Sequence, residues 1–247
     1  MRGEADIAKV GALIADPARA RILLALADGR ELPATVLASE AGVTASTTSS
    51  HLGKLLDGSL LTVRRQGRHR YYALAGPAVA EALEKLMTLA PAGPVRSLRQ
   101  GTRANAVRTA RTCYDHLAGM LGAGLMGSML ERGLLTGGDG TFTPGEGDRL
   151  SGPGHACDYE LTDRGRRELD AFGIELDALA RLRRPLIRYC VDWSEQRHHL
   201  AGALGAAIAQ RTLELGWVTR ARTGRAVHVT PVGRDGLADV FGLTIAA

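Results

Sequence analysis

Two stretches of the chain carry thiol and imidazole groups at related spacings. The first is Cys113-Tyr-Asp-His116, and the second is Cys190-Val-Asp192, which is followed by His199. Thiolate and imidazole are the ligands preferred by zinc and other soft metals. A thiol redox pair would require the two sulfur atoms to meet, which no spacing shows. Buried cysteines often serve only as small apolar residues, so we predict packing, with no metal and no cofactor.

The same four residues allow other roles. They are our candidates for effector contact: Cys113, His116, Cys190 and His199. A thiol-dependent enzyme with a cysteine nucleophile and a histidine base is less favoured, because the chain has no nucleophile elbow, phosphate loop or metalloprotease motif. We therefore predict that the protein is not an enzyme.

Residues 44–55 are rich in hydroxyl groups (Thr-Ala-Ser-Thr-Thr-Ser-Ser-His-Leu-Gly-Lys-Leu). On a helix, Thr48, Leu52 and Leu55 share one face, which predicts that this face packs on the core. The opposite face would offer short polar side chains to the base edges and phosphates of DNA. The candidate DNA contacts here are Thr44, Ser46, Thr47, Ser49, Ser50, His51 and Lys54.

A basic segment follows, Arg64-Arg-Gln-Gly-Arg-His-Arg70, with four arginines in seven positions and no acid. It joins two runs rich in β-branched and aromatic residues, 60–65 and 69–74, which predicts a β-hairpin. A basic hairpin tip suits DNA phosphates and the narrow minor groove. The candidate contacts are Arg64, Arg65, Arg68, His69 and Arg70.

Helical patterns surround these segments. We predict helices at 5–14, after Asp16-Pro17, at 33–40, at 45–56 with Thr44 as N-cap, and at 77–90. Pro91-Ala-Gly-Pro94 cannot continue a helix and marks a boundary. We therefore predict a DNA-binding and dimerisation domain at 1–92, and an effector or regulatory domain at 93–247.

The second domain contains an apparent internal repeat. Besides the cysteine motifs, Tyr159-Glu-Leu-Thr-Asp-Arg-Gly165 resembles Val227-His-Val-Thr-Pro-Val-Gly233. Each copy is predicted as helix, strand, strand, helix, with Cys113 and His116 one turn apart on the first helix. The predicted fold class is mainly α with small β-hairpins (α+β): a winged helix-turn-helix followed by a duplicated winged-helix-like domain.

Residues 18–74 resemble the ArsR/SmtB family of bacterial repressors. The matching motifs are Ala18-Arg-Ala-Arg-Ile-Leu23, Leu32-Pro33, Ala41-Gly-Val43, Ser50-His-Leu52 and Tyr71-Tyr72. The resemblance implies a homodimer that pairs through helices 5–14 and 77–90, with recognition helices one DNA turn apart on a pseudo-palindrome. One departure is Asp57-Gly-Ser-Leu60, where Ser59 is expected to strain a turn.

The metal sites common in this family are missing from the sequence. Residues 32–43 contain neither Cys nor His, and residues 77–89 contain Glu81 and Glu84 but no His. The resemblance therefore does not imply a metal sensor.

The composition agrees with this interpretation. The net charge is +5 and the three cysteines form no disulfide framework, which favours a reducing cytoplasm. No apolar run approaches the roughly 18 residues of a membrane span, so we expect no membrane partner. We predict a homodimeric repressor that binds a pseudo-palindromic operator in double-stranded DNA and is released by a small effector. A repressor that responds to metal or thiol redox is the alternative.

Overall fold

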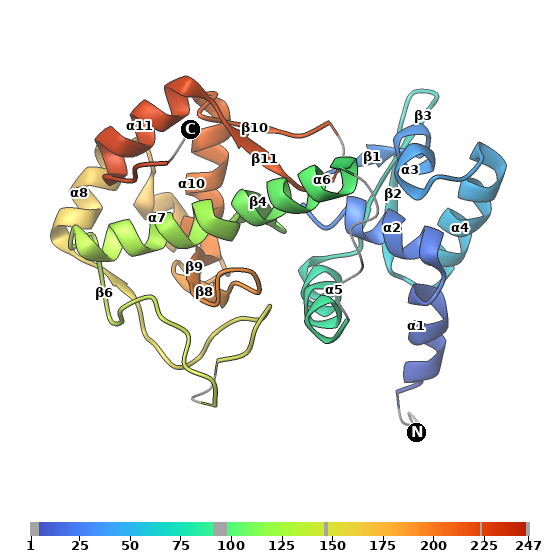
Figure 1. Cartoon of the computed structure of the whole chain (residues 1–247), viewed down its shortest axis with the longest axis horizontal. Coiled ribbons are helices and arrows are strands. Elements are labelled where there is room, and N and C mark those ends of the chain that lie inside the picture. Colours follow the sequence, from blue (N-terminus) through green and yellow to red (C-terminus); the bar gives the residue numbers. More distant parts are fainter. Residues whose placement is uncertain (1–4, 91–97, 146–147, 223, 246–247) are drawn as a thin grey trace. The chain divides into compact units, whose positions relative to one another are not determined.

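The computed structural model describes residues 5–90, 98–145, 148–222 and 224–245 (Figure 1). The chain divides into two compact units. One comprises the chain up to Leu83 together with 222–225, and the other comprises 84–221 with 226–247. The predicted domain boundary at 92/93 lies outside the described residues, within 91–97, and stays a prediction.

The first unit is built from short helices and a small sheet. Its elements are α1 (Ile7–Ile14), α2 (Pro17–Ala25), β1 (Leu32–Pro33), α3 (Ala34–Ala41), α4 (Ala45–Asp57), β2 (Leu61–Gln66) and β3 (His69–Leu74), followed by α5 (Pro77–Leu89). The antiparallel sheet has the order β1-β3-β2. Strand β1 was not predicted, because two residues carry no detectable periodicity.

Local signals explain where these helices begin and end. Asp16 accepts hydrogen bonds from the backbone N–H groups of Ala18 and Arg19, both at 2.9 Å, and so caps α2. Thr44 caps α4, and Gly42 ends α3 in the left-handed conformation with φ +71°. Ser59 also has positive φ, +56°, so the expected strained turn is present.

The second unit includes the end of α5, from Glu84 on, and α6 (Leu98–Thr109), and then shows the same order of elements twice. In each half a hairpin leads into a long helix, and a second strand pair leads into a final helix. The first half has β4 (Arg111–Cys113), β5 (His116–Ala118), α7 (Gly119–Glu131), β6 (Leu135–Thr136), β7 (Glu160–Leu161) and α8 (Asp163–Ala171). After α9 (Leu176–Ala180), the second has β8 (Arg188–Val191), β9 (His198–Ala201), α10 (Gly202–Glu214), β10 (Val218–Arg220), β11 (Val227–Val229) and α11 (Pro231–Phe241).

The prediction that Cys113 and His116 lie on one helix is wrong. They face each other across the β4–β5 hairpin, and α7 begins only at Gly119. Tyr114, at the turn, has φ +59°, which a right-handed helix cannot contain. Three-residue strands are too short to show alternation, so the sequence did not reveal them.

The last helix of each half begins in the same way. Thr162 and Thr230 accept hydrogen bonds from the N–H groups of Gly165 and Gly233, at 3.0 and 2.9 Å. A Cβ on either glycine would lie about 2 Å from a carbonyl oxygen, 2.1 Å from Leu134 O and 1.9 Å from Trp217 O. Glycine is therefore required at both positions. No helix in the described part of the chain has the length and apolar character needed to traverse a bilayer.

Candidate functional site

Helix α4 has the two faces that the sequence predicts. Thr48, Leu52 and Leu55 are at most 1% exposed and anchor the helix on the core. The other face is solvent-exposed and presents Ser46, Thr47, Ser49, Ser50 and Lys54. The helix thus holds a row of short polar groups on a rigid scaffold.

The first turn of α4 is dense in hydroxyl groups. Oγ1 of Thr44 lies 3.1 Å from Oγ of Ser46 and 2.9 Å from Oγ1 of Thr47. These groups lie at the positive end of the helix dipole, where backbone N–H groups attract anions. The arrangement suits a DNA phosphate.

His51 is placed differently from the other predicted contacts. Its side chain is 13% exposed, and Nδ1 lies 3.9 Å from Oδ1 of Asp16, the cap of α2. The imidazole therefore faces the scaffold, whereas the hydroxyl groups of α4 face solvent.

The predicted hairpin is formed by β2 and β3, with Gln66 opposite His69 and a tight turn at Gly67, whose φ is +58°. Arg65 lies directly across from Arg70. Directly opposed residues point to the same face of a sheet, so two like charges are adjacent there. Arg65, Arg68, His69 and Arg70 are all exposed, and the three arginines form no ion pair with any residue the structure describes.

Arg64 points to the opposite face of the same hairpin and has partners within the unit. Its Nε and Nη2 donate to Oε2 of Glu31, at 2.8 and 2.5 Å, and its guanidinium lies 5.5 Å from the ring centroid of Tyr71. The hydrogen bond from Arg64 lowers the pKa of Glu31. Sequence analysis missed this pairing because Glu31 lies far from the hairpin in the chain.

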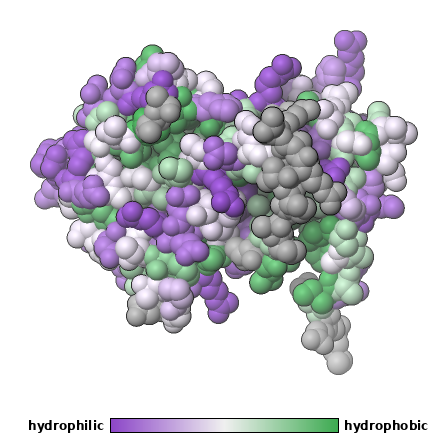
Figure 2. All heavy atoms as spheres, viewed as in Figure 1, coloured by the Kyte–Doolittle hydropathy of each residue, from purple (hydrophilic) through white to green (hydrophobic). Residues whose placement is uncertain are grey.

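Helices α1 and α5 each present large apolar side chains to solvent. No described residue of α1 is buried, and Ile7 and Val10 are 83% and 42% exposed. Leu86 and Leu89 on α5 are 44% and 81% exposed. The hydropathy surface shows hydrophobic side chains over α1, at the lower right (Figure 2). Apolar surface of this kind is typical of an interaction site.

The four candidate residues of the second unit come together. Cys113 pairs with His116 across the β4–β5 hairpin, and Cys190 pairs with His199 across the β8–β9 hairpin. One side-chain ligand atom from each lies within 4.8 Å of all the others, and the imidazole centroids are 5.2 Å apart. We call this set the Cys–His cluster.

Each histidine of the Cys–His cluster lies beside an aspartate. Nδ1 of His116 is 3.1 Å from Oδ1 of Asp115, and Nδ1 of His199 is 3.2 Å from Oδ2 of Asp192. Arginine from the other half contacts each carboxylate: Arg184 Nη2 lies 3.1 Å from Asp115 Oδ1, and Arg111 Nη2 lies 2.8 Å from Asp192 Oδ1.

These contacts set the protonation of the carboxylates. Burial alone would raise the pKa of both, but His116 and Arg184 outweigh burial and lower the pKa of Asp115 to about 2. His199 and Arg111 likewise hold the pKa of Asp192 well below its ordinary value. Both groups are therefore carboxylates at neutral pH.

The thiol and imidazole of the first hairpin respond to the same surroundings. Burial lowers the pKa of His116, but its interactions with Cys113 and Asp115 outweigh burial and raise the pKa to about 9. A hydrogen bond with Cys190 and burial raise the pKa of Cys113.

A second buried polar network, centred on Asp148 and His198, was not predicted from the sequence. His198 contacts Oδ2 of Asp148 through Nε2 and the Tyr159 hydroxyl through Nδ1, both at 2.7 Å. The Tyr189 hydroxyl donates to Oδ1 of Asp148 at 2.6 Å and accepts from the N–H of Ala156 at 2.7 Å. This network fastens the glycine-rich connection between α7 and β7 to the β8–β9 hairpin.

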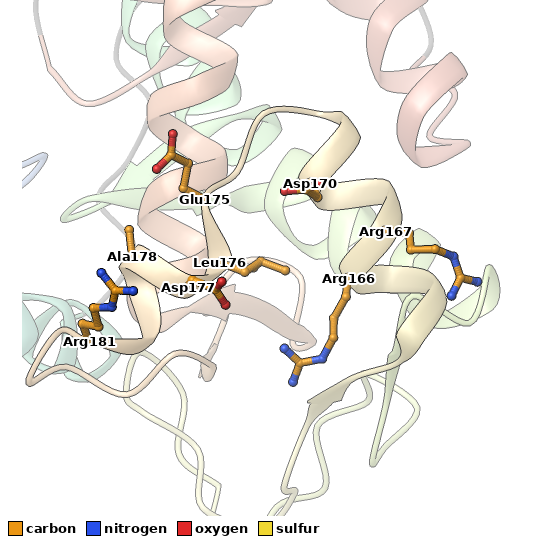
Figure 3. A pocket seen from close by; sticks show the side chains of 8 residues that line it. All are labelled: Arg166, Arg167, Asp170, Glu175, Leu176, Asp177, Ala178 and Arg181. Carbon is orange, nitrogen blue, oxygen red and sulfur yellow. The ribbon is translucent and has the colours of Figure 1, made fainter.

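A surface groove of about 600 Å³ lies between α8 and α9 (Figure 3). It is lined by three arginines and three acids together with Leu176 and Ala178. Arg166, Arg167 and Arg181 point in different directions, so no set of like charges converges on one point (Figure 3). The groove does not resemble a site for one charged ligand.

The chain is similar to helix-turn-helix regulators of transcription. Residues 14–64 match the model of a helix-turn-helix domain. The chain is 39% identical over 229 residues to the uncharacterized HTH-type transcriptional regulator YdfF of Bacillus subtilis, covering 93% of this chain and 94% of that protein. It is 42% identical over 84 residues to the HTH-type transcriptional regulator CmtR of Mycobacterium tuberculosis, covering 34% of this chain and 70% of that protein.

Solved structures each cover about a third of the chain. The NMR structure of the cadmium metal-sensor CmtR from M. tuberculosis is 38% identical and covers 37% of this chain and 94% of that one, with a TM-score of 0.31. The homodimeric winged helix-turn-helix domain of Mb0332 from Mycobacterium bovis is 32% identical and covers 36% of this chain and 89% of that one, with a TM-score of 0.32.

Proposed function

Because the chain belongs to the ArsR/SmtB-type family of winged helix-turn-helix transcriptional regulators, we propose that this DNA-binding regulator is a homodimeric repressor. It binds a pseudo-palindromic operator in double-stranded DNA, and the second unit controls that binding. As a regulator of transcription it acts in the cytoplasm, and we propose no catalytic role for it.

The observation that carries the proposal is that the first unit contains both α4 and the basic β2–β3 hairpin. Helix α4 presents hydroxyl groups suited to base edges and phosphates, and the hairpin presents Arg65, Arg68 and Arg70 without ion-pair partners among the described residues. Arg65 and Arg70 repel each other across the hairpin, and a phosphate placed between them would relieve that repulsion.

The exposed apolar residues of α1 and α5 support dimerisation through these helices. Ile7 and Leu89 are more than 80% exposed, and removing such side chains from water would stabilise a dimer. A two-fold dimer presents two recognition helices, which would account for an operator with two similar half-sites. The winged helix-turn-helix domain of Mb0332, to which the chain is similar, is homodimeric.

We further propose that the two halves of the second unit are copies of one ancestral module. Both halves have the same element order, and the helices α7 and α10 each begin at a glycine with positive φ, +73° at Gly119 and +79° at Gly202. Both final helices use the Thr-x-x-Gly cap described above. Two packed copies would form a regulatory domain that reports an effector to the DNA-binding unit, provided that the effector binds one conformation better than the other.

The experiment is DNase footprinting of the chain on the DNA upstream of its own gene. Two protected half-sites about one helical turn apart are expected, together with repression in a reporter strain. Protection of a single half-site by a monomer would contradict the dimer. Equal affinity for this DNA and for random DNA of the same length would contradict operator recognition. Candidate metabolites and metal ions are then added, and loss of protection identifies the effector class.

A repressor that responds to metal or thiol redox remains the second candidate function. The observation that favours it is the convergence of Cys113, His116, Cys190 and His199. It predicts that footprint protection changes on adding a soft divalent metal or a mild oxidant, and that Cys113→Ser with Cys190→Ser abolishes this change.

A further inference from the structure

The Cys–His cluster has the donor set of a closed zinc site. It offers two sulfur and two imidazole donors, which is one of the common four-ligand sets for tetrahedral zinc. Each hairpin contributes one cysteine and one histidine at directly opposed positions. The four donors are therefore held by backbone pairing in both hairpins, and none depends on a long loop.

The spacing of the donors fits one small cation. Bond lengths of about 2.3 Å to sulfur and about 2.0–2.1 Å to nitrogen place tetrahedral ligand atoms about 3.3–3.8 Å apart. The observed donors lie within 4.8 Å of one another. The widest donor separation exceeds the tetrahedral value by about 1 Å, which is a distance that side-chain rotation can close while the hairpin backbones stay in place.

The histidines have nitrogen atoms that the protein interior does not satisfy. His116 and His199 are 5% and 2% exposed, and Nε2 of each has no hydrogen-bond partner among the described residues. A buried polar atom without a partner is costly, and native interiors rarely contain one. Nδ1 of His116 is hydrogen-bonded to Asp115, so Nε2 is the nitrogen of that ring left to bind a ligand. Nδ1 of His199 lies 3.2 Å from Oδ2 of Asp192 without a hydrogen bond, and Nε2 faces away from that carboxylate.

The aspartates complete the arrangement expected around a metal. Ligating histidines commonly donate their second N–H to a carboxylate, which fixes the tautomer and the ring orientation. Here Asp115 and Asp192 lie at that position, and Asp192 is held by Arg111 and by the N–H of Gly119 at 2.7 Å. The Cys-x-Asp motif thus contains both a ligand and the group that orients a histidine.

Two glycines lie where α7 and α10 pass the Cys–His cluster. A Cβ on Gly122 would lie 3.5 Å from Cβ of His199, and a Cβ on Gly205 would lie 3.3 Å from Cβ of His116. Each would also meet the carbonyl oxygen of the preceding strand, at 2.3 Å from Leu117 O and 2.6 Å from Leu200 O. The carbonyl oxygen of the same half therefore requires glycine at both positions, and each glycine also lies beside the histidine of the other half.

We propose that Cys113, His116, Cys190 and His199 bind one zinc ion in tetrahedral Cys₂His₂ geometry, joining the two halves of the second unit. Zinc binds the two thiolates, and the two thiol protons are released to solvent. All four protein ligands are used, so the site is closed and its role is to hold the two hairpins together. The proposal does not depend on DNA binding.

The first test measures metal content. The full chain, purified without chelator from cells grown with zinc, is expected to contain one zinc per chain by inductively coupled plasma mass spectrometry. Cys113→Ser with Cys190→Ser is expected to contain none. Cys157→Ser is the matched control, because Cys157 lies outside the Cys–His cluster, and it is expected to keep one zinc.

The second test reports geometry. Chelator-treated protein titrated with Co²⁺ is expected to develop the strong visible bands of tetrahedral cobalt and a thiolate-to-cobalt charge-transfer band, both saturating at one equivalent. His116→Cys preserves four protein donors and is expected to keep tight binding with an added thiolate-to-cobalt band, whereas His116→Ala leaves three donors and is expected to bind cobalt at least about 10-fold more weakly. This pair distinguishes loss of a ligand from loss of folding, since both variants remove the same imidazole.

The third test addresses the aspartates as positioning residues. Asp115→Asn is expected to keep one equivalent of metal but to weaken zinc affinity about 10- to 100-fold in competition with a chelator. The proposal is overturned if the wild-type chain binds no zinc or cobalt, or if the double serine variant retains the metal. It is also overturned if Cys157→Ser loses the metal, or if the chain purified anaerobically carries a Cys113–Cys190 disulfide in its place.

Discussion

The β2–β3 hairpin allows a quantitative prediction about DNA binding. Replacing Arg65, Arg68 and Arg70 by alanine removes three exposed charges from each protomer. The hairpin should remain folded, because Arg65 and Arg70 face each other as like charges and their loss removes a repulsion. The change therefore acts on binding and leaves the fold intact.

The size of the change in salt dependence follows from the number of phosphate contacts that are lost. If each arginine neutralises one phosphate, a dimer of the variant loses about six contacts, and the slope of log K against log salt becomes shallower by about 5. Between 50 and 200 mM salt, the wild-type protein would then lose about a thousand-fold more affinity than the variant. The loss should be similar on operator and random DNA, because phosphates carry no sequence information.

The assay is fluorescence anisotropy with labelled operator DNA at four or five salt concentrations. Arg64→Ala is the matched control: Arg64 is bonded to Glu31 and points to the other face of the hairpin, so the slope should change little. Glu31→Gln should release Arg64 and make the slope slightly steeper. An unchanged slope in the triple variant, with circular dichroism and the melting temperature retained, would refute the assignment of the hairpin to phosphates.

Four further substitutions test the fold and the dimer. Gly233→Ala should destabilise the second unit by about 2 kcal/mol or more in urea unfolding, because its Cβ would meet Trp217 O at 1.9 Å. Gly53→Ala on α4, where no atom lies within 4 Å of the new Cβ, should instead stabilise the first unit by roughly 0.5–1 kcal/mol. Ile7→Glu should raise the dimer dissociation constant about 100-fold in sedimentation equilibrium, since burial of an apolar side chain contributes roughly 1.5–3 kcal/mol. An unchanged dissociation constant would exclude α1 from the interface. The hydrogen bond from the backbone N–H of Arg19 lowers the pKa of Asp16, so the contribution of Asp16 to stability is present above its unfolded pKa and is lost as the pH falls through the lowered folded value. The difference in melting temperature between wild type and Asp16→Ala should therefore vanish in acid, and a constant difference would contradict the role of the charge.

Much of the first unit was predictable because its signals are local. Asp16-Pro17 and Thr44 mark helix starts through hydrogen bonds within three residues, and the spacing of Thr48, Leu52 and Leu55 reports one buried face. Hairpins with strands of six residues also leave a readable pattern. Hairpins with strands of three residues do not, which is why β4–β5 was predicted as helix.

Contacts between distant residues could not be predicted in the same way. The ion pair between Arg64 and Glu31 and the network of Asp148, His198 and Tyr189 depend on which loops meet in space. No sequence spacing encodes such a meeting, because it is decided by how whole elements pack.

The Cys–His cluster shows most clearly which features are predictable from sequence and which depend on the packed chain. The sequence by itself determined which residues could do soft-metal chemistry, and it showed that Cys113 and Cys190 begin similar motifs; from these facts alone, packing was the better prediction. Only the tertiary structure decided that the four donors converge, because β5 and β9 lie against each other. Metal binding requires donors within a few ångströms of one point, and that distance is a property of the packed chain.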